Sequence, residues 1–454
     1  MGETKQRDYF GDYALMRVPP EESRTTLNIF FVYTGVLAVV AAIWAGSGLA
    51  MMYDAKTMII VTLIGNIILG ILGFLVATVG GYNRAATGLI LRYPMGRIGS
   101  MIGSLIVAGL PLIMWFAVET WLFGVVLNAI WPDQIWANIA VASIWGGFLM
   151  MTTAYFGYRA IALLSYITVP FWFVLITIGF GAALDVSGGW ATLWTAKPET
   201  IAPLGAGITF VVGVYASGCN ITSDVSRYGK KPWSGGVAWF IHVVFLMTLL
   251  LFIGGSMTLV TGSPNVIIAM GKIGMGLAAL LLAAFGQWST NDNNLWSAYL
   301  GWVNVVGRGR RGFWIIVVGV IGTLIAGVWA GLYGASLDPF IAFGIFLGYF
   351  IPPVGAALIA DFYIFRPYIV GAKNPYERYK FGPGTEYAWI NLPGLIAVVV
   401  GGIVGYYTTI MNIGVPVLNG IFTSFILYLA LIIPMHKAGI RYEFGKWIER
   451  PSGF

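Results

Sequence analysis

Residues Gln287-Trp288-Ser289-Thr290-Asn291-Asp292-Asn293-Asn294 form a mostly polar stretch between the apolar runs 277–285 and 295–306. The flanking runs are typical of a membrane-spanning helix, and an unpaired polar group inside a membrane costs several kcal/mol. One or two amide or hydroxyl side chains are enough to hold neighbouring helices together. Six hydroxyl, amide and carboxyl side chains in a row predict instead that this segment faces a wet cavity, a ligand or an ion.

The composition of the 454-residue chain is that of an integral membrane protein. Hydrophobic residues make up 58% and charged residues only 9%, whereas soluble domains carry about 25% charged residues. The mean hydropathy is +0.83. The 61 glycines and 18 tryptophans fit the enrichment of both residues in helical membrane proteins. We therefore predict an all-α integral membrane protein without a soluble domain.

Apolar runs of about 20 residues, the length that crosses a bilayer, recur along the chain. We predict about twelve transmembrane helices, at 27–52, 58–82, 100–130, 135–156, 159–184, 206–226, 234–261, 273–303, 312–332, 338–364, 387–409 and 414–436. No linker divides them, so residues 27–436 are expected to form a single transmembrane transport domain. No cleavable signal peptide is expected, because the first 24 residues are charged and include Pro19-Pro20. Residues 1–26 are expected to be a solvated N-terminal tail, with a second tail at 437–454.

The positions of Lys and Arg test this division and give an orientation. If the N-terminus is cytoplasmic, every basic residue except Lys56, Lys197 and Lys272 falls in a cytoplasmic tail or loop. Such a bias follows the positive-inside rule. It predicts a multi-pass plasma-membrane protein with both termini in the cytoplasm, and it explains the net charge of +7 without a nucleic-acid partner.

The acidic residues inside the predicted spans are Glu119, Asp292 and Asp361. Asp361 lies close to the headgroups and is expected to be structural, whereas the sequence assigns no role to Asp292. No His/Cys cluster, phosphate-binding loop or nucleophile–base spacing accompanies these acids, so the sequence does not support an enzyme.

Three other side chains in the spans are expected to be structural rather than part of a binding site. Asp224 is followed three residues later by Arg227, so a local ion pair is expected. His242 stands alone on an apolar helix and is expected to have its hydrogen bonds satisfied in the core. Cys219 is the single cysteine, which excludes an intrachain disulfide and favours a packing role.

Runs of small residues in two predicted spans favour an interruption of the helix. In the sixth span, glycines and other small residues surround Tyr215, and the first span carries Gly35, Gly46 and Gly48. Glycine weakens a helix interior by about 1 kcal/mol relative to Ala. Helices broken at matching positions in two halves expose backbone N–H and C=O groups at the membrane midplane. Close helix packing explains the same glycines equally well.

The polar stretch has a face suited to a cation. Gly286, Ser289 and Thr290 are spaced i, i+3 and i+4, so they share one face of a helix. One carbonyl and two hydroxyls, with carbonyls from an unwound neighbouring helix, would give five oxygens around a hard monovalent cation. Asn291 and Asn294 lie on an adjoining face, where they are candidates for contact with a polar ligand.

The third span pairs an aromatic ring with a carboxylate. Trp115 and Glu119 are spaced i and i+4. A flat nitrogenous heterocycle needs both groups, because the ring supplies stacking area and the carboxylate accepts hydrogen bonds. The same spacing fits an aromatic side chain packed beside a buried acid, so spacing alone does not separate the two interpretations.

Four motifs are scattered over nearly the whole chain: Leu63-Ile-Gly-Asn-Ile-Ile-Leu-Gly70, Asp224-Val-Ser-Arg-Tyr-Gly229, Trp288-Ser-Thr-Asn-Asp-Asn293 and Tyr349-Phe-Ile-Pro-Pro-Val-Gly-Ala-Ala-Leu-Ile-Ala-Asp361. In residues and in order they resemble the nucleobase–cation symporter-1 family, most closely its bacterial cytosine/purine permease branch. The resemblance implies a leucine-transporter-like fold, with inverted five-helix repeats at about 27–184 and 206–364. Two extra helices would follow at about 387–436. It also implies import of a heterocycle with sodium or protons and no cofactor.

Carried over residue by residue, the resemblance implies a ring sandwich and a set of polar contacts. Trp115 and Tyr215 match the two aromatic faces, and Tyr215 stands where relatives have Phe or Trp. The remaining implied contacts to the substrate are the amides of Asn291 and Asn294 and the backbone of Val214 and Ser217.

For the cation, Ser289 and Thr290 match the sodium-coordinating hydroxyls of the family. Gly286 and first-span carbonyls near Val39 and Ala42 are implied to complete the shell.

The third span departs from that of cytosine permeases. They carry Gln one turn before the Trp, where this chain has Leu112 or Pro111. Glu119, one turn after the Trp, stands where hydantoin and eukaryotic relatives have an amide. A carboxylate accepts from an amino group and an adjacent ring N–H together, as guanine offers, or pairs with a cationic amine or an aminopyrimidine.

We therefore predict a secondary-active symporter that imports a purine or cytosine-like nucleobase with sodium. Hydroxymethylpyrimidine, thiamine, allantoin and hydantoin stay open as substrates, and the proton stays open as the coupling ion. An ion channel would spread polar residues along several spans, whereas here they concentrate near one depth. The expected partners are a small heterocycle, a monovalent cation and the lipid bilayer; the sequence does not give the oligomeric state.

Overall fold

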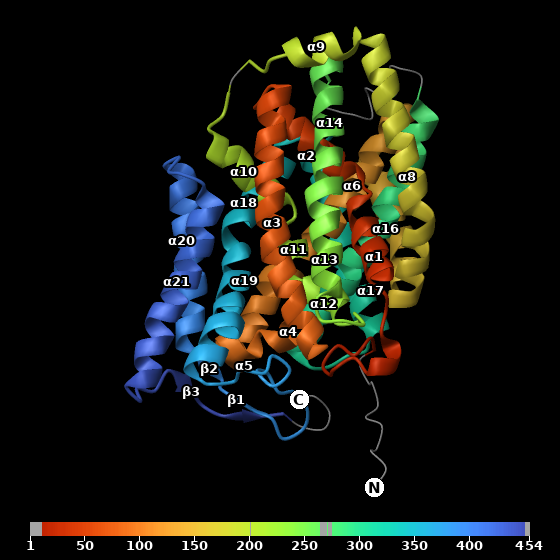
Figure 1. Ribbon diagram of the computed structural model, residues 1–454. Helices are drawn as coiled ribbons and strands as arrows, with labels where there is room; N and C mark the ends of the chain where they lie inside the picture. The colour runs from red at the N-terminus through yellow and green to blue at the C-terminus, as the bar shows by residue number, and fades with distance from the viewer. Residues whose placement is uncertain (1–10, 200, 264–269, 271–274, 450–454) are drawn as a thin grey trace.

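Long apolar helices run side by side in the computed structural model, which describes residues 11–199, 201–263, 270 and 275–449 (Figure 1). Among these residues, eight helices are long and apolar enough to cross a membrane, and the bent pair α1 (Thr26–Leu37) and α2 (Val40–Ala50) makes a ninth. Five of the eight are single helices: α3 (Ala55–Asn83), α8 (Tyr158–Val186), α17 (Arg311–Tyr333), α20 (Leu392–Ile410) and α21 (Pro416–Lys437). The other three are composite. Arg92–Ile130 consists of α5 (Arg92–Ser104), η2 (Leu105–Gly109) and α6 (Pro111–Ile130); Ser234–Thr261 consists of α13 (Ser234–Ile241), η4 (His242–Met247) and α14 (Thr248–Thr261); Asp338–Ile369 consists of α18 (Asp338–Phe350), α19 (Pro352–Ile359) and η5 (Ala360–Ile369). The prediction of a helical membrane protein is confirmed.

Three of the predicted spans take another form. The span at 135–156 is α7 (Ile139–Ala154), which is shorter than a bilayer-crossing helix. The span at 206–226 is a chain of three short helices, α10 (Leu204–Val214), α11 (Ala216–Asn220) and α12 (Thr222–Ser226). The span at 273–303 is α16 (Gly276–Val306), whose polar centre makes it less apolar than the other long helices. The count of twelve spans stays a prediction.

Two spans are interrupted, as their sequences predicted. The first bends by 58° between α1 and α2, where Ala38 and Val39 leave the helical conformation. The sixth divides at Tyr215 and again at Ile221. Backbone N–H and C=O groups beside each interruption lose their partners within the helix and become available to other parts of the protein.

The glycines beside the interruptions serve close packing rather than the bend itself. Gly46 on α2 faces the backbone carbonyl of Leu251 on α14, and Gly213 on α10 faces the carbonyl of Gly344 on α18. A Cβ atom at either glycine would overlap the facing oxygen. The structure therefore bears out both explanations that the sequence left open: the two spans are interrupted, and these glycines permit close helix packing.

Both ends of the described chain lie at one end of the bundle, at the bottom of Figure 1, which we call the terminal face. The short helix α9 (Gly189–Thr195) lies at the opposite end. At the terminal face, residues 11–24 pack against the helices, with Ala14, Leu15 and Val18 buried. The expectation of a solvated tail is wrong for these residues, because the bundle covers their apolar side chains.

The C-terminal segment is docked at the same face. Strand β4 (Trp447–Ile448) pairs antiparallel with β1 (Glu386–Tyr387), and β3 (Glu443–Phe444) pairs with β2 (Ile390–Asn391). These two-residue strands are the departure from the predicted all-α fold. Arg92 anchors the segment, because its guanidinium lies 3.5 Å from the carboxylate of Glu449 and 5.1 Å from the ring centre of Trp447.

Asp361 ties together three parts of the chain near the terminal face. Its buried carboxylate accepts hydrogen bonds from the hydroxyls of Tyr379 (2.5 Å) and Tyr428 (2.6 Å) and from Nε of Arg366. A buried charge is tolerated when it is paired and its oxygens are bonded. These contacts give Asp361 the structural role expected from its position.

The expected ion pair between Asp224 and Arg227 is wrong. The Asp224 carboxylate accepts from the backbone N–H of Thr87, at 2.8 Å, at the start of α4 (Thr87–Ile90). Arg227 donates through Nε to the backbone carbonyl of Asp224, also at 2.8 Å. Both side chains are buried, and each is directed to backbone groups that have no partner within a helix.

Candidate functional site

The two interrupted spans meet at a cavity inside the bundle. Its empty space, including the space open to solvent at its mouth, is about 760 Å³. Residues of α1, α2, α6, α10–α12, α13, η4 and α16 line it. Among the residues predicted from the sequence, the lining contains Val39, Ala42, Trp115, Glu119, Val214, Tyr215, Ser217, Thr290 and Asn294. Gly286, Ser289 and Asn291 lie outside the lining.

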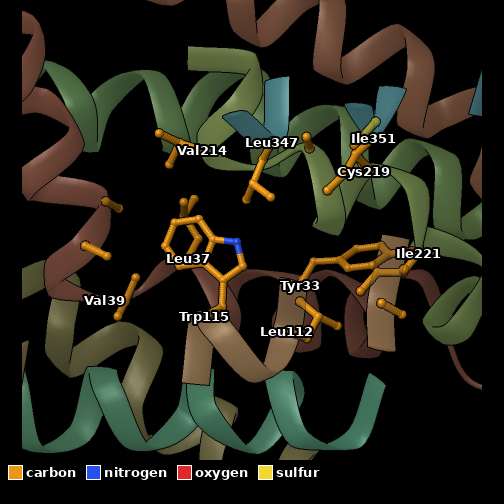
Figure 2. Close-up of a cluster of buried hydrophobic side chains, with 14 of the residues drawn as sticks. Tyr33, Leu37, Val39, Leu112, Trp115, Val214, Cys219, Ile221, Leu347 and Ile351 are labelled. Carbon is orange, nitrogen blue, oxygen red and sulfur yellow. The ribbon is translucent and has the colours of Figure 1, made fainter. Parts of the chain in front are cut away.

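Trp115 stands on α6 in the apolar part of the cavity. Figure 2 shows its indole among Leu37, Val39 and Val214, which belong to the two interrupted spans. Phe343, which does not border the cavity, packs against the indole, with 5.3 Å between the ring centres and an interplanar angle of 60°. The indole is therefore held by packing while it also borders the cavity, as a stacking platform requires.

Tyr215 reaches the cavity from the break between α10 and α11. Its ring packs on Trp239 (5.0 Å between ring centres) and on His242 (5.6 Å). Tyr33 of α1 contacts the same two rings. Tyr33, Tyr215 and Trp239 border the cavity, and His242 packs behind them. The expectation that His242 has satisfied hydrogen bonds is wrong, because neither ring nitrogen has a partner among the residues that the structure describes.

We expect Trp115→Ala to weaken substrate binding by about 1 kcal/mol or more, since it removes a stacking face. This corresponds to a Kd at least about fivefold higher by isothermal titration. Tyr215→Ala is expected to behave similarly and Tyr215→Phe to be mild, provided that the ring rather than the hydroxyl makes the contact. Trp145→Ala, on α7 outside the cavity lining, serves as the control. Wild-type affinity in both cavity alanine variants would exclude the ring sandwich.

Two polar groups in the lining have no hydrogen-bond partner among the described residues. They are Oε2 of Glu119 and Oγ of Ser217, and both side chains are only 1% exposed. Buried polar atoms in native proteins are usually bonded, so such a pair marks a position where polar atoms of a ligand would be satisfied. Glu119, which the sequence predicts to contact substrate, therefore borders the cavity with one carboxyl oxygen unpartnered among the described residues.

Asn291 and Asn294 have different positions. Asn294 lines the cavity, and its Nδ2 donates to Oδ1 of Asn291 at 3.2 Å. Asn291 is fully buried, and its own Nδ2 donates toward α6, to Oγ1 of Thr120 at 3.1 Å. In this structure Asn291 orients Asn294 instead of bordering the cavity itself.

The hydroxyls of the polar stretch meet the carbonyl groups at the end of α1. Ser289 Oγ donates to the carbonyl of Gly35 at 2.8 Å, and Thr290 Oγ1 donates to that of Val36 at 2.8 Å. Gly286 lies against the carbonyl of Ala38, which a side chain at this position would displace. The residues present therefore fit a hard monovalent cation, because they bring only oxygen atoms together.

The carbonyls that the two hydroxyls contact are not the predicted ones. The resemblance implied Val39 and Ala42, whereas the hydroxyls bond to Gly35 and Val36, about one turn earlier. Val39 and Ala42 instead border the cavity. A backbone carbonyl has no residue-specific signal, so only the position of the break can identify which ones are exposed.

Asp292 points away from the cavity, toward α7. Its Oδ1 accepts from Oγ1 of Thr153 at 2.6 Å, and Thr153 accepts in turn from Nε1 of Trp288. This connection holds α16 against α7 behind the candidate site. The acid in the middle of the polar stretch therefore contributes to the position of α16 and does not border the cavity.

Residues 11–24 close the terminal face beside the cavity. Asp12 joins two groups of helices there: its carboxylate accepts from Nε1 of Trp296 and from Arg311, both at 2.9 Å, on α16 and α17. Its backbone carbonyl accepts from Arg227 at 2.8 Å, just after α12. A movement that separates the interrupted sixth span from α16 must therefore break contacts of Asp12.

We expect Asp12→Ala to open the terminal face more often, because it removes charge-assisted hydrogen bonds worth about 1.5 kcal/mol or more. In a Cys219→Ser background, maleimide should modify Val225→Cys, in the cavity lining, about tenfold faster. Glu22→Ala is the matched control, since Glu22 pairs only with Arg24 and Arg159 among the described ion pairs. An unchanged rate in Asp12→Ala would show that Asp12 does not hold this face closed.

Among the polar and aromatic residues that border the cavity, sequence reasoning missed Tyr33, Trp239, Asn293 and Ser297. Asn293 and Ser297 belong to the polar region of α16, and their position near the two asparagines was a usable signal. Tyr33 and Trp239 had no such signal, because aromatic residues are common throughout the chain.

Comparison with known proteins gives one consistent result. Residues 18–430 match the family described as permease for cytosine/purines, uracil, thiamine and allantoin. The cytosine permease of Escherichia coli K12 is 28% identical over 414 residues, which cover 91% of this chain and 92% of that protein, and the O157:H7 protein gives the same values.

Solved structures show the same fold. The nucleobase-cation-symport-1 transporter MHP1, closed with bromovinylhydantoin bound, has a TM-score of 0.75 at 18% identity over 93% of this chain and 94% of MHP1. The inward-facing conformation of MHP1 has a TM-score of 0.72 at 17% identity, over 94% of this chain and 98% of that chain. A Na+-coupled sialic acid symporter, substrate-bound and outward-open, has a TM-score of 0.63 at 13% identity, over 95% of this chain and 93% of that chain.

Proposed function

Because this chain belongs to the family of permeases for cytosine/purines, uracil, thiamine and allantoin, we propose that it imports a nucleobase with sodium by alternating access. The substrate would be a purine or a cytosine-like heterocycle. One observation carries the proposal: the cavity at the two helix breaks combines an aromatic face, an unpartnered carboxylate and, at its edge, an oxygen-only cation face. A symporter needs these two sites to be adjacent, so that each ligand changes the affinity for the other.

The proposed architecture is that of the family. Twelve spans would form two inverted repeats, at about 27–184 and 206–364, with two extra helices at about 387–436 and both termini in the cytoplasm of a plasma-membrane protein. The breaks in the first and the sixth spans support this division, because they are the first spans of the two proposed repeats.

In the proposed substrate site, the ring of the heterocycle lies on Trp115, with Tyr215 as the second aromatic face. Glu119 accepts from its N–H groups, and Ser217 and Asn294 supply further hydrogen bonds. The support for these roles is that all five residues border one cavity and that two of them carry unpartnered polar atoms.

In the proposed cation site, sodium binds to the hydroxyls of Ser289 and Thr290 and to carbonyls at the end of α1. The hydroxyl hydrogens, which now point to Gly35 and Val36, would turn away so that the oxygens face the ion. Sodium would thus replace direct contacts between α1 and α16 by contacts through the ion, and it would fix the bend of the first span. A proton is the alternative coupling ion.

A second candidate substrate is an aminopyrimidine vitamin precursor of the hydroxymethylpyrimidine type. Glu119 favours it, because a carboxylate pairs with the amino group and a protonated ring nitrogen of such a compound. Hydantoin is less well matched to Glu119, since each of its ring N–H groups has a neighbouring carbonyl that would face the second carboxylate oxygen. The ureido group of allantoin offers paired N–H groups, so allantoin stays open.

A thermal-shift screen of the purified protein tests the proposal. Guanine, adenine, cytosine, uracil, hydroxymethylpyrimidine, thiamine, allantoin and hydantoin are each added in sodium or in choline chloride. We expect one chemical group of these compounds to raise Tm, and to raise it more in sodium. A larger effect at low pH, without dependence on sodium, would favour proton coupling. No stabilisation by any heterocycle in any buffer would contradict the proposed substrate class.

A further inference from the structure

We infer that Gln287 is a positioning residue that couples the cation face of α16 to the placement of Glu119 at the cavity. This inference rests on the proposed symport function and concerns how its two sites communicate. Gln287 is fully buried and does not border the cavity. It follows Gly286 and precedes Ser289 by two residues, so it lies inside the cation-binding segment without offering a ligand to the ion.

One end of the Gln287 amide caps the break in the first span. Its Oε1 accepts from the backbone N–H of Val40, the first residue of α2, at 3.3 Å. The first N–H groups of a helix have no partner within that helix, and the preceding residue, Val39, makes no side-chain cap. An unpaired N–H inside a membrane costs several kcal/mol, so α16 supplies the missing acceptor.

The other end of the amide reaches the residue expected to contact substrate. Nε2 of Gln287 donates to the backbone carbonyl of Glu119 at 3.2 Å. Glu119 itself presents an unpartnered oxygen and borders the cavity. Gln287 therefore holds the main chain of Glu119, from which the carboxyl group extends to the cavity.

The cation face and the amide thus contact the two sides of one break. Ser289 and Thr290 bind carbonyls at the end of α1, whereas Gln287 binds the start of α2. An ion that fixes α1 against α16 fixes the bend, and the bend sets where the N–H of Val40 lies. Because a single rigid amide joins this N–H to Glu119, a shift at one end is transmitted to the other.

The measurable quantity is the coupling factor, which is the factor by which saturating sodium raises the affinity for substrate. Thermodynamic linkage requires the substrate to raise sodium affinity by the same factor, which is typically about 5 to 150. We compare Gln287→Met, which keeps the length of the side chain but makes no hydrogen bond, with wild type. Substrate Kd is measured at zero and at saturating sodium, with the compound that the thermal-shift screen identifies.

We expect Gln287→Met to lower the coupling factor to within about twofold of one, from the roughly 5 to 150 typical of coupled sites. Sodium binding without substrate, measured by its effect on Tm, should change by less than about threefold, since the hydroxyl and carbonyl oxygens remain. The matched control is Asn66→Leu, which removes a buried amide that joins α3 to Thr248 on α14 at 2.9 Å. It should leave the coupling factor unchanged.

Gln287→Glu provides a second variant if the methionine protein does not fold. It keeps the oxygen that accepts from Val40 and removes the permanent donor toward Glu119, so it should fold and still show a reduced coupling factor. In a Glu119→Gln background, Gln287→Met should have a smaller further effect than in wild type, because the two residues act as one unit. A residue that is merely structural would show additive effects.

The outcomes separate the inference from the proposed function. A wild-type coupling factor well above one, with the same factor in Gln287→Met, overturns the role of Gln287 and leaves symport intact. A wild-type factor of one at constant pH overturns sodium coupling and the inference together. A reduced factor in both Gln287→Met and Asn66→Leu also overturns the inference, since it would reflect general loosening of the helix packing.

Discussion

Replacing both Ser289 and Thr290 by alanine is expected to abolish sodium-dependent uptake while leaving the protein folded. Each hydroxyl now contacts a carbonyl of α1, and the proposed ion would take both oxygens as ligands. An interaction with a charge is worth about 1.5–3 kcal/mol, so each loss should raise the sodium concentration for half-maximal uptake roughly 10- to 100-fold. Uptake of labelled substrate into proteoliposomes against a sodium series measures this shift.

Two controls distinguish loss of the ion from loss of structure. Thr290→Ser keeps the oxygen and should stay close to wild type. Thr323→Ala removes a similarly buried threonine whose hydroxyl, among the described residues, bonds only to the carbonyl of Gly319 on its own helix. The sodium dependence of this variant should not change. If the Ser289/Thr290 double variant transports with wild-type sodium dependence, the ion binds elsewhere or the coupling ion is the proton.

The second large effect is expected at Glu119, the residue that should decide substrate choice. Glu119→Gln keeps the shape of the side chain but replaces one acceptor by a donor. Ligands that present paired N–H groups to the carboxylate, as guanine does, should bind more weakly by roughly 1–3 kcal/mol, which is the cost of mismatching a buried hydrogen bond. Ligands that present a carbonyl there, such as uracil or hydantoin, should lose less or gain affinity.

Competition against labelled substrate by guanine, adenine, cytosine, uracil and hydroxymethylpyrimidine measures this change in preference. The informative result is the rank order in wild type compared with that in Glu119→Gln, since a general loss of stability would weaken all ligands together. An identical rank order in both proteins would remove Glu119 from substrate recognition. It would then be a structural or proton-coupling residue.

The polar residues that border the cavity from α6 and α16 were accessible to sequence reasoning because local chemistry marks them. A carboxylate or a row of amides in an apolar helix is costly without a partner, so Glu119, Thr290 and Asn294 are conspicuous in the sequence. Helical spacing then placed Ser289 and Thr290 on one face, and the structure shows both hydroxyls directed to the same turn of α1.

Backbone groups and long-range partners were not accessible in this way. Gly35 and Val36 contribute carbonyls that every residue has, and these carbonyls are free to accept because α1 ends at Leu37. Gln287 was visible as a polar residue, but its partners Val40 and Glu119 are 247 and 168 residues away in sequence. No local pattern specifies such a pair.

The sequence by itself determined that this protein is a helical membrane protein, where its apolar helices lie and which helices carry buried polar side chains. Those properties follow from the cost of placing charges and unpaired polar groups in hydrocarbon, which acts on each segment separately. Only the tertiary structure decided that the first span bends at Ala38 and Val39, that Asn291 supports Asn294 and that residues 11–24 close the terminal face. These features depend on which distant groups meet, and they are stabilised by hydrogen bonds and packing between helices that no single segment contains.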